Sequence, residues 1–305
     1  MDVRKLRHFA AVAETLHFAR AAERLHMTQP PLSQSILALE RELGAALFAR
    51  TKRRVALTAF GAQWLAHVQP ALEALDALSE AARRLCDGTA GRLTLSFVST
   101  ADYNVLPPLV RRYAEQFPQV ELSLTEATSD LQIPALLERR TQAGIIIPPL
   151  TALPSELDYV RLTHEPLVAA VPDLWVREGR IRVVDRRLTR ETVLALPLVL
   201  FPRPVAPAFH DLVTGYFASE GVRPAVAQEA IQMQTIISLV SAGLGIALVP
   251  ASLRNLTRAG VRYLDLADAP PTLETGLAWR RDDDTPTLRH LLQIVGQTVE
   301  REFPT

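Results

Sequence analysis

Apolar residues in the first 60 positions repeat every three or four residues, which predicts short helices packed on a common core. The repeat indicates one helix over residues 3–15 and a second from Ala19 to Leu25. A third helix extends through Leu32 to Leu43, with Thr28 at its N-cap and Gly44 at its end. The spacing therefore predicts three helices before the first extended segment.

The predicted third helix has two faces of different character. Leu32, Ile36 and Leu39 form an apolar stripe, whereas short polar side chains stand near the N-terminal end, at Gln29, Ser33 and Gln34. Such side chains on a recognition helix reach base edges in the major groove of DNA, and the free N–H groups of the helix start can bind a phosphate. The alternative is a purely structural helix.

The segment after the third helix is a basic turn between two short extended pieces. It covers residues 48–58 and contains Arg50, Lys52, Arg53 and Arg54. We expect a wing that lies on the DNA backbone or in the minor groove. The competing interpretation is a solvated basic loop.

A heptad pattern begins at Trp64 and predicts a long helix. Apolar positions alternate in steps of four and three residues, at Trp64, Val68, Ala71, Leu75, Leu78, Ala82 and Leu85. A second copy of the chain is the simplest way to bury such a seam, and a dimer suits a palindromic DNA site. The alternative is packing on the chain's own C-terminal part. We expect the helix to end in a hinge at residues 87–91.

Strand and helix patterns alternate from Arg92 onward, which indicates an α/β fold with a mostly parallel sheet. The pattern predicts a first subdomain of residues 91–161 and 268–305, and a second of residues 162–267. Two crossings between them would form a hinged pair that can close like a clamshell.

Candidate ligand contacts follow predicted strands in both subdomains. Ser99 and Thr100 follow the first strand, Thr128 follows the second, and Phe201, Pro202 and Arg203 follow a strand of the other subdomain. Ligands of open α/β sheets bind outside the carboxyl ends of strands. Hydroxyl groups, backbone amides and the Arg203 guanidinium would suit a small carboxylate. Ser99 and Thr128 could instead cap the helices that follow them.

Composition divides the 305-residue chain into a basic and an acidic part. Residues 1–60 contain ten Lys and Arg against five Asp and Glu, and the resulting charge of +5 is balanced by −5 in the rest. A basic N-terminal part is typical of phosphate binding. The single cysteine, Cys86, excludes an internal disulfide, and no apolar run is long enough to span a membrane. We therefore expect a cytoplasmic protein.

Motifs for catalysis, metal binding and cofactors are missing from the sequence. No Gly-x-Ser-x-Gly, phosphate-binding glycine loop or Cys/His metal spacing occurs, and the seven histidines are scattered. The sequence predicts a protein that is not an enzyme and needs no cofactor or metal.

Ordered N-terminal motifs resemble those of the LysR-type transcriptional regulators. They are Phe18–Ala22, Thr28–Ser33, Leu39–Glu40, Leu43–Gly44, Leu47–Thr51 and Leu57–Gly61. The resemblance implies that Gln29, Pro30, Ser33 and Gln34 lie in the major groove and that Arg50 and Arg53 contact phosphates. Thr28, at the start of the same helix, is also expected to bind DNA. Many members have arginine where this chain has Gln34; glutamine suits adenine, whereas arginine favours guanine.

The C-terminal part also resembles this family, through Gly243–Pro250 and Leu200–Arg203. The resemblance implies two subdomains similar to periplasmic binding proteins, with Ser99, Thr100, Thr128 and Phe201 as effector contacts. Residues 200–203 resemble in particular the subgroup that controls aromatic and chloroaromatic catabolism. Relatives usually carry an acid at the position of Gln142, a difference expected to alter the edge of the ligand crevice or its charge.

The sequence as a whole predicts an N-terminal all-α winged helix-turn-helix (residues 1–60), a long linker helix for dimerisation with its hinge (61–90), and an α/β effector domain (91–305). We expect a homo-oligomer, a dimer or a tetramer, on a partly palindromic promoter site. A small aromatic or dicarboxylic acid would act as effector, and RNA polymerase as a further partner. The rival interpretations are a small-molecule binding protein or enzyme without DNA affinity, and a non-specific architectural DNA-binding protein.

Overall fold

The first three helices form around one apolar stripe of the third. The computed structural model describes residues 2–50 and 54–302, and the chain divides into units of residues 1–85 and 86–305. The three predicted helices are confirmed as α1 (Val3–Thr15), α2 (Phe18–Arg24) and α3 (Gln29–Leu43). Pro30 and Pro31 occupy the first turn of α3, where their missing N–H groups cost nothing, and Gly44 ends α3 with φ 69°.

A short antiparallel hairpin follows α3 and packs on the same core. It consists of β1 (Phe48–Arg50) and β2 (Val55–Leu57). The Glu40 carboxylate accepts hydrogen bonds from the backbone N–H groups of Leu47 (2.8 Å) and Phe48 (3.2 Å). This charged acceptor joins α3 to the start of the hairpin, so α3 and the hairpin belong to one packed body.

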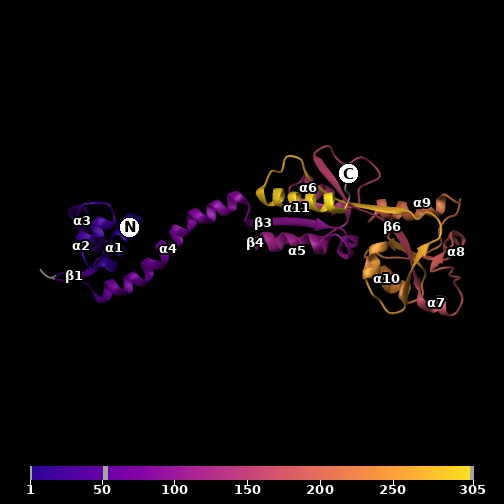
Figure 1. Cartoon of the computed structure of the whole chain (residues 1–305), viewed down its shortest axis with the longest axis horizontal. Helices are drawn as coiled ribbons and strands as arrows, with labels where there is room; N and C mark the ends of the chain where they lie inside the picture. The colour runs from indigo at the N-terminus through magenta and orange to yellow at the C-terminus, as the bar shows by residue number, and fades with distance from the viewer. Residues whose placement is uncertain (1, 51–53, 303–305) are drawn as a thin grey trace. The chain divides into compact units, whose positions relative to one another are not determined.

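The predicted heptad seam lies on α4 (Ala59–Asp87), and its residues are buried near the start of the helix but exposed farther along. Val68 of the seam is buried in the core of the N-terminal unit; at the next step Leu72, which the seam did not include, is buried there and the predicted Ala71 is exposed. Farther along, Leu75, Leu78 and Leu85 are 36%, 60% and 57% exposed. Only the later part of the seam is therefore open for another chain. Figure 1 shows α4 as one continuous helix.

The C-terminal unit is built on a mixed sheet. Its strands run in the order β4-β3-β5-β12-β6-β11-β7, and β10 also pairs with β6. Their bounds are β3 (Ala90–Phe97), β4 (Gln119–Glu126), β5 (Ala143–Ile146), β6 (Leu157–Pro172), β7 (Arg187–Leu188), β10 (Ala247–Pro250), β11 (Val261–Leu266) and β12 (Thr272–Arg280).

The prediction of a mostly parallel sheet is wrong. Strand β3 is parallel to β4 and β5, but β12 is antiparallel to β5 and β6, and both β10 and β11 are antiparallel to β6. For β12 the reason is the second crossing: the chain returns along β12 beside the outgoing strand β6, and a returning strand beside an outgoing one is antiparallel.

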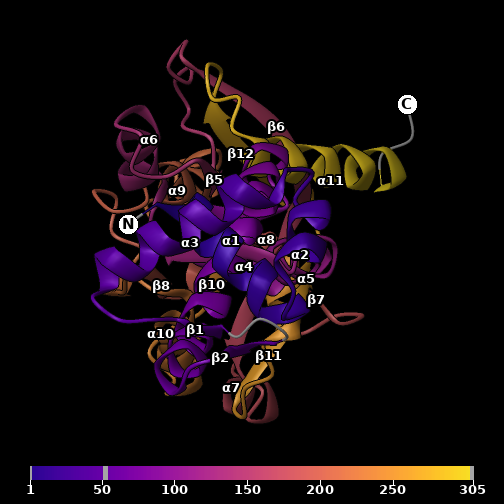
Figure 2. The same ribbon diagram turned by 90° about the vertical axis from the view of Figure 1, so that its left-hand side faces the viewer.

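The two crossings of the C-terminal unit are the long strands β6 and β12. Figures 1 and 2 show β6 running from the half that carries α6 and α11 into the half that carries α7 and α10. It continues without a break through Leu162, the predicted subdomain boundary. The first half contains η1 (Ser99–Tyr103), α5 (Leu106–Gln116), α6 (Ser129–Leu137) and α11 (Pro286–Glu302). The second contains α7 (Asp173–Arg177), α8 (Arg190–Ala195), β8 (Leu198–Leu200), α9 (Pro207–Ala218), β9 (Val226–Glu229), α10 (Met233–Ser241) and η2 (Ala251–Asn255).

The last helix, α11, packs on the first half of the C-terminal unit. The Tyr113 hydroxyl of α5 donates a hydrogen bond to the Thr287 carbonyl of α11 (3.0 Å), and the His290 ring stacks on Phe117 at 4.1 Å. Each half thus has its own apolar core. In the part of the chain that the structure describes, no helix combines the length and apolarity needed to cross a membrane.

One core position of the N-terminal unit is titratable. His8 of α1 is buried, and its Nδ1 shares a hydrogen bond of 2.8 Å with the Ser35 hydroxyl of α3. Burial, and then the nearby Arg4 cation, lower the pKa of His8 from its ordinary value of 6.5.

We predict that the N-terminal unit loses stability in mild acid through His8. Because the pKa is lower in the folded state, the contribution of neutral His8 is complete above pH 6.5 and is lost as the pH falls through the folded value. The stability lost in His8→Gln should therefore be larger at pH 7.5 than at pH 5.5, measured by thermal unfolding of the full chain. His67→Gln, at an exposed position of α4, is the control. A stability difference that stays constant across this range would contradict the prediction.

Candidate DNA interface and ligand cavity

The side chains on the polar face of α3 face solvent and are not used in contacts that hold the fold together. Thr28, Gln29, Pro30 and Gln34 are exposed and Ser33 is half-buried, while Leu32, Ile36 and Leu39 on the other face are fully buried. Gln29, Ser33 and Gln34 form no side-chain hydrogen bond with the described residues. Thr28 stands at the N-cap position but its side chain makes no capping bond. The structure thus brings the predicted base-reading residues together at one accessible helix end.

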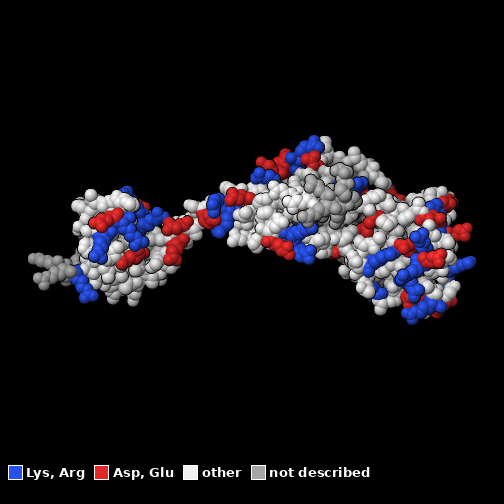
Figure 3. Space-filling view, viewed as in Figure 1, with Lys and Arg blue, Asp and Glu red and all other residues white. Residues whose placement is uncertain are grey.

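One of the two predicted phosphate contacts lies in the hairpin. Arg50 ends β1 and its backbone pairs with Val55, whereas Arg53 lies outside the described residues. Arg54, immediately before β2, is exposed. Lys and Arg side chains lie on the visible face of the N-terminal unit together with some acidic ones (Figure 3). The roles of Arg50 and Arg53 stay predictions.

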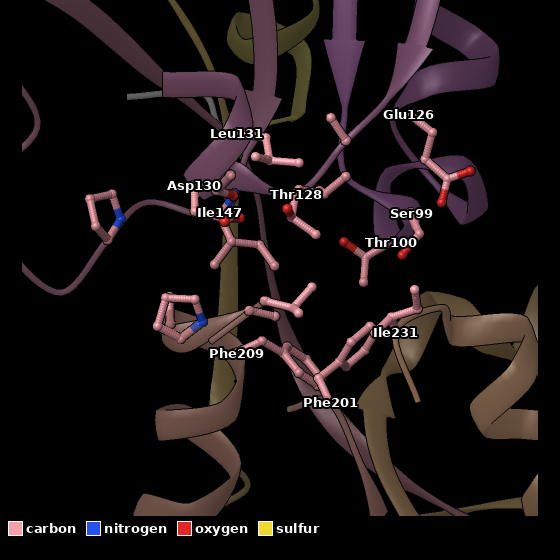
Figure 4. A pocket seen from close by; sticks show the side chains of 18 of the residues that line it. Ser99, Thr100, Glu126, Thr128, Asp130, Leu131, Ile147, Phe201, Phe209 and Ile231 are labelled. Carbon is pink, nitrogen blue, oxygen red and sulfur yellow. The ribbon is translucent and has the colours of Figure 1, made fainter. Parts of the chain in front are cut away.

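A cavity of about 400 Å³ lies between the two halves of the C-terminal unit. The first half contributes residues of η1 and of the start of α6, and the second contributes the end of β8 and the starts of α9 and α10. Figure 4 shows Ser99, Thr100 and Thr128 on one side of the cavity and Phe201, Phe209 and Ile231 on the other. One wall is therefore rich in hydroxyl groups and the opposite wall is apolar.

Thr100 is the least satisfied polar group of this cavity. Its side chain is only 5% exposed, and its hydroxyl has no hydrogen-bond partner among the described residues. In Figure 4 this hydroxyl is directed toward Thr128, which lies on the same side of the cavity. A buried polar group without a partner costs free energy, so a bound polar group that pairs with it would be favoured.

The start of α6 is held beside the cavity by buried polar contacts. Gln132 is completely buried; its carbonyl oxygen accepts from the Ser96 hydroxyl (2.9 Å), and its amide donates to the Ala127 carbonyl (2.7 Å) and the Ile145 carbonyl (3.1 Å). The Ser129 hydroxyl accepts a hydrogen bond from the Ile147 N–H (3.0 Å). Thr128 occupies the N-cap position without capping α6 through its side chain, so its hydroxyl remains available.

The structure places the other predicted contacts differently. Phe201 lines the cavity, but Pro202 and Arg203 do not. The Arg203 guanidinium donates two hydrogen bonds of 2.8 Å to the Asp211 carboxylate and lowers the pKa of Asp211 to about 2. That ion pair holds the Arg203 side chain on Asp211 of α9. The expected effect of Gln142 on the crevice is not seen either, because Gln142 binds Thr94 and Thr285 and does not line the cavity.

Sequence reasoning missed two acidic lining residues, Glu126 and Asp130. Their positions in the sequence could have indicated them, because Glu126 ends the second strand and Asp130 follows Thr128 by two positions. It also missed the apolar residues Ile147, Phe209 and Ile231. These lie at strand ends or helix starts, where the sequence pattern resembles ordinary core.

A helix-turn-helix with a wing, followed in the same chain by an α/β unit with a cavity between two halves, defines a DNA-binding regulator with a ligand-binding domain. Residues 3–62 match the family model of the bacterial regulatory helix-turn-helix protein of the lysR family, and residues 87–300 match that of the LysR substrate binding domain.

Whole-chain relatives agree with these models. The HTH-type transcriptional regulator IlvR of Caulobacter vibrioides is 65% identical over 296 residues, which cover 97% of each chain. The HTH-type transcriptional regulator AlsR of Bacillus subtilis is 36% identical over 294 residues, which cover 96% of this chain and 95% of AlsR. Full-length CbnR in complex with its target DNA has a TM-score of 0.79 at 28% identity, and the match covers 98% of this chain and 99% of CbnR.

The chain belongs to the LysR family of bacterial transcriptional regulators. It is a DNA-binding regulator with an effector-binding domain, and not an enzyme. The predicted fold class, a winged helix-turn-helix followed by a periplasmic-binding-protein-like α/β domain, is confirmed.

We predict that Gln132→Leu destabilises the C-terminal unit by roughly 1–3 kcal/mol, since the Ser96 hydroxyl and two buried carbonyl groups lose their partner. Urea unfolding followed by far-UV circular dichroism measures the change. Gln116→Leu, an exposed position on α5, should change the stability by much less. Equal stability of the two variants would contradict the structural role of Gln132.

Proposed function

We propose that the chain binds a partly palindromic promoter site as a homo-oligomer and responds to a small acid in the cavity between its halves. DNA binding is supported mainly by the polar face of α3, whose side chains are accessible and form no hydrogen bonds with the described residues. The amide groups of Gln29 and Gln34 can each form two hydrogen bonds with adenine N6 and N7, which would give the site an adenine preference.

The exposed part of the α4 seam supports the oligomer. Leu75, Leu78 and Leu85 follow one another at heptad spacing and remain open to solvent in a single chain. Burying them against the same residues of a second copy would remove this apolar surface from water and create the two-fold symmetry that a palindrome requires. We propose a dimer, or two dimers joined as a tetramer.

Two features of the C-terminal unit support an effector that closes its halves. Leu131 and Ile231 line the cavity from opposite halves and are 61% and 62% exposed, so closure on a ligand would bury apolar surface. Glu165 of β6 accepts hydrogen bonds from the Asn104 amide (2.7 Å) on one side and from the Ser252 N–H (2.7 Å) on the other. This carboxylate links η1, which carries Ser99 and Thr100, to η2 of the other half.

We further propose that the effector is a small aromatic or dicarboxylic acid and that the chain acts in the cytoplasm, where it contacts RNA polymerase. The apolar wall of Phe201 and Phe209 suits a ring or a short hydrocarbon. The hydroxyls of Thr100 and Thr128 and the first amides of α6 suit a carboxylate. The likeness of residues 200–203 to regulators of aromatic and chloroaromatic catabolism supports the aromatic alternative.

We predict that Gln29→Ala and Gln34→Ala weaken sequence-specific DNA binding. Each variant should lose roughly 1–3 kcal/mol of discrimination between the chain's own upstream promoter and random DNA, with the salt dependence unchanged because no cation is removed. Fluorescence anisotropy with both DNAs at two salt concentrations measures this, and Gln116→Ala is the control. Similar losses on both DNAs would instead favour a non-specific architectural protein, and no loss on either would contradict DNA binding by α3.

We predict that benzoate or succinate raises the unfolding temperature of the full chain and that Thr100→Val reduces this rise. Binding to the folded state stabilises it by mass action, and the variant removes the unpaired hydroxyl with little change of volume. Thr125→Val, exposed on β4, should retain the full rise. No stabilisation by any small acid, or an equal rise in all three proteins, would contradict this cavity as the effector site.

A further inference from the structure

The charged side chains that line the cavity carry one sign of charge. Glu126 ends β4 and Asp130 lies in the first turn of α6, and the described lining contains no Lys, Arg or His. The nearest predicted cation, Arg203, is occupied by Asp211. A ligand with a carboxylate alone would add a negative charge beside two others without gaining a cationic partner.

A second, smaller cavity of about 50 Å³ adjoins the first and is polar. The two share Ser99, Glu126 and Gln232, and the smaller one adds the carboxylate of Asp102. Neither Asp102 nor Glu126 forms a side-chain hydrogen bond or ion pair with the described residues. Although the Asp102 side chain is largely open to solvent, its neighbours shield it enough that partial burial raises the pKa of its carboxyl group. Two unpaired carboxylates at a space of this size suit an ammonium group.

The unpaired Thr100 hydroxyl offers a second polar contact to the ligand, close to the carboxylates of the smaller cavity. Ser99, at the junction of the two cavities, and Thr100, which faces the larger one, are consecutive in η1. Figure 4 shows Glu126 beside Ser99, with Thr100 and then Thr128 farther into the cavity. Ligand groups bound at Glu126 and at Thr100 would therefore be neighbours within the ligand.

The remaining surface of the larger cavity is apolar. Phe201 and Phe209 form an edge-to-face pair with ring centroids 5.5 Å apart, and Ile231 lies on the same side in Figure 4. This wall faces the row of hydroxyls, so one molecule would present polar groups on one side and hydrocarbon on the other.

We propose that the effector is an α-amino acid with an apolar side chain. Its ammonium group binds between Asp102 and Glu126 in the smaller cavity. Its carboxylate binds the hydroxyls of Thr100 and Thr128 and the first amides of α6, and its side chain packs on Phe201, Phe209 and Ile231. The inference rests on the proposed effector role of this cavity and replaces a simple acid by a zwitterion, whose ammonium group offsets the repulsion described above.

Two ligand series test the proposal on the full chain by isothermal titration calorimetry. One compares L-leucine with 4-methylpentanoate, which lacks the amine, and 3-methylbutylamine, which lacks the carboxylate. The other compares L-phenylalanine with 3-phenylpropanoate and 2-phenylethylamine. In at least one series the amino acid should bind roughly tenfold more tightly than both analogues, because each charged group adds charge-assisted hydrogen bonds.

Variants of the smaller cavity separate recognition of the amine from general damage. Glu126→Gln and Asp102→Asn should weaken binding of the amino acid roughly tenfold and leave binding of the acid analogue unchanged or tighter. Glu115→Gln, exposed on α5 outside both cavities, is the control and should change neither. Equal weakening of the amino acid and of its acid analogue would overturn the assigned role of these carboxylates.

The outcomes distinguish this proposal from the function on which it rests. If an acid analogue, benzoate or succinate binds as tightly as the amino acids or more tightly, the amino-acid proposal is overturned but the effector cavity stands. If no compound of either series binds and neither do benzoate and succinate, both proposals fail together.

Discussion

The effector-binding unit depends on backbone pairing along one sixteen-residue strand, β6 (Leu157–Pro172). Its first part pairs with β12 in the sheet of the first half, and its last part pairs with β10 and β11 in the second. Since β6 pairs through its backbone N–H and C=O groups with strands of both halves, this one strand fixes where the two halves of the sheet meet. The cavity lies where they meet.

Side-chain contacts then determine how the polar groups are presented there. The completely buried amide of Gln132 fixes α6 to the sheet, so that Thr128 and the first amides of α6 face the cavity. Glu165 connects η1 and η2 through Asn104 and Ser252. Neither residue lines the larger cavity, yet each determines the position of residues that do.

Electrostatics distinguish this cavity from a general carboxylate site. The cation that the sequence offered, Arg203, is neutralised by Asp211, and the charges left in the lining are those of Glu126 and Asp130. The predicted preference for a small acid therefore depends on hydroxyls and helix amides alone. The same arrangement leaves room for a positive group on the ligand, which the local sequence pattern does not indicate.

The sequence by itself determined the elements and the family. Apolar residues at helical spacing gave α1, α2 and α3 with bounds close to those observed, because these patterns are local and one buried stripe, Leu32 to Leu39, specifies one helix face. Ser99, Thr100, Thr128 and Phe201 were predicted by their place after strands and by family position, and all four line the cavity. Tertiary structure decided the direction of the strands, the division of the α4 seam and the partner of Arg203. These depend on contacts that no local pattern shows: β12 pairs with β6 more than a hundred positions away, and Arg203 meets Asp211 only because the chain turns between β8 and α9. A linear pattern shows which residues must be buried or charged, but only the folded chain shows which of them meet.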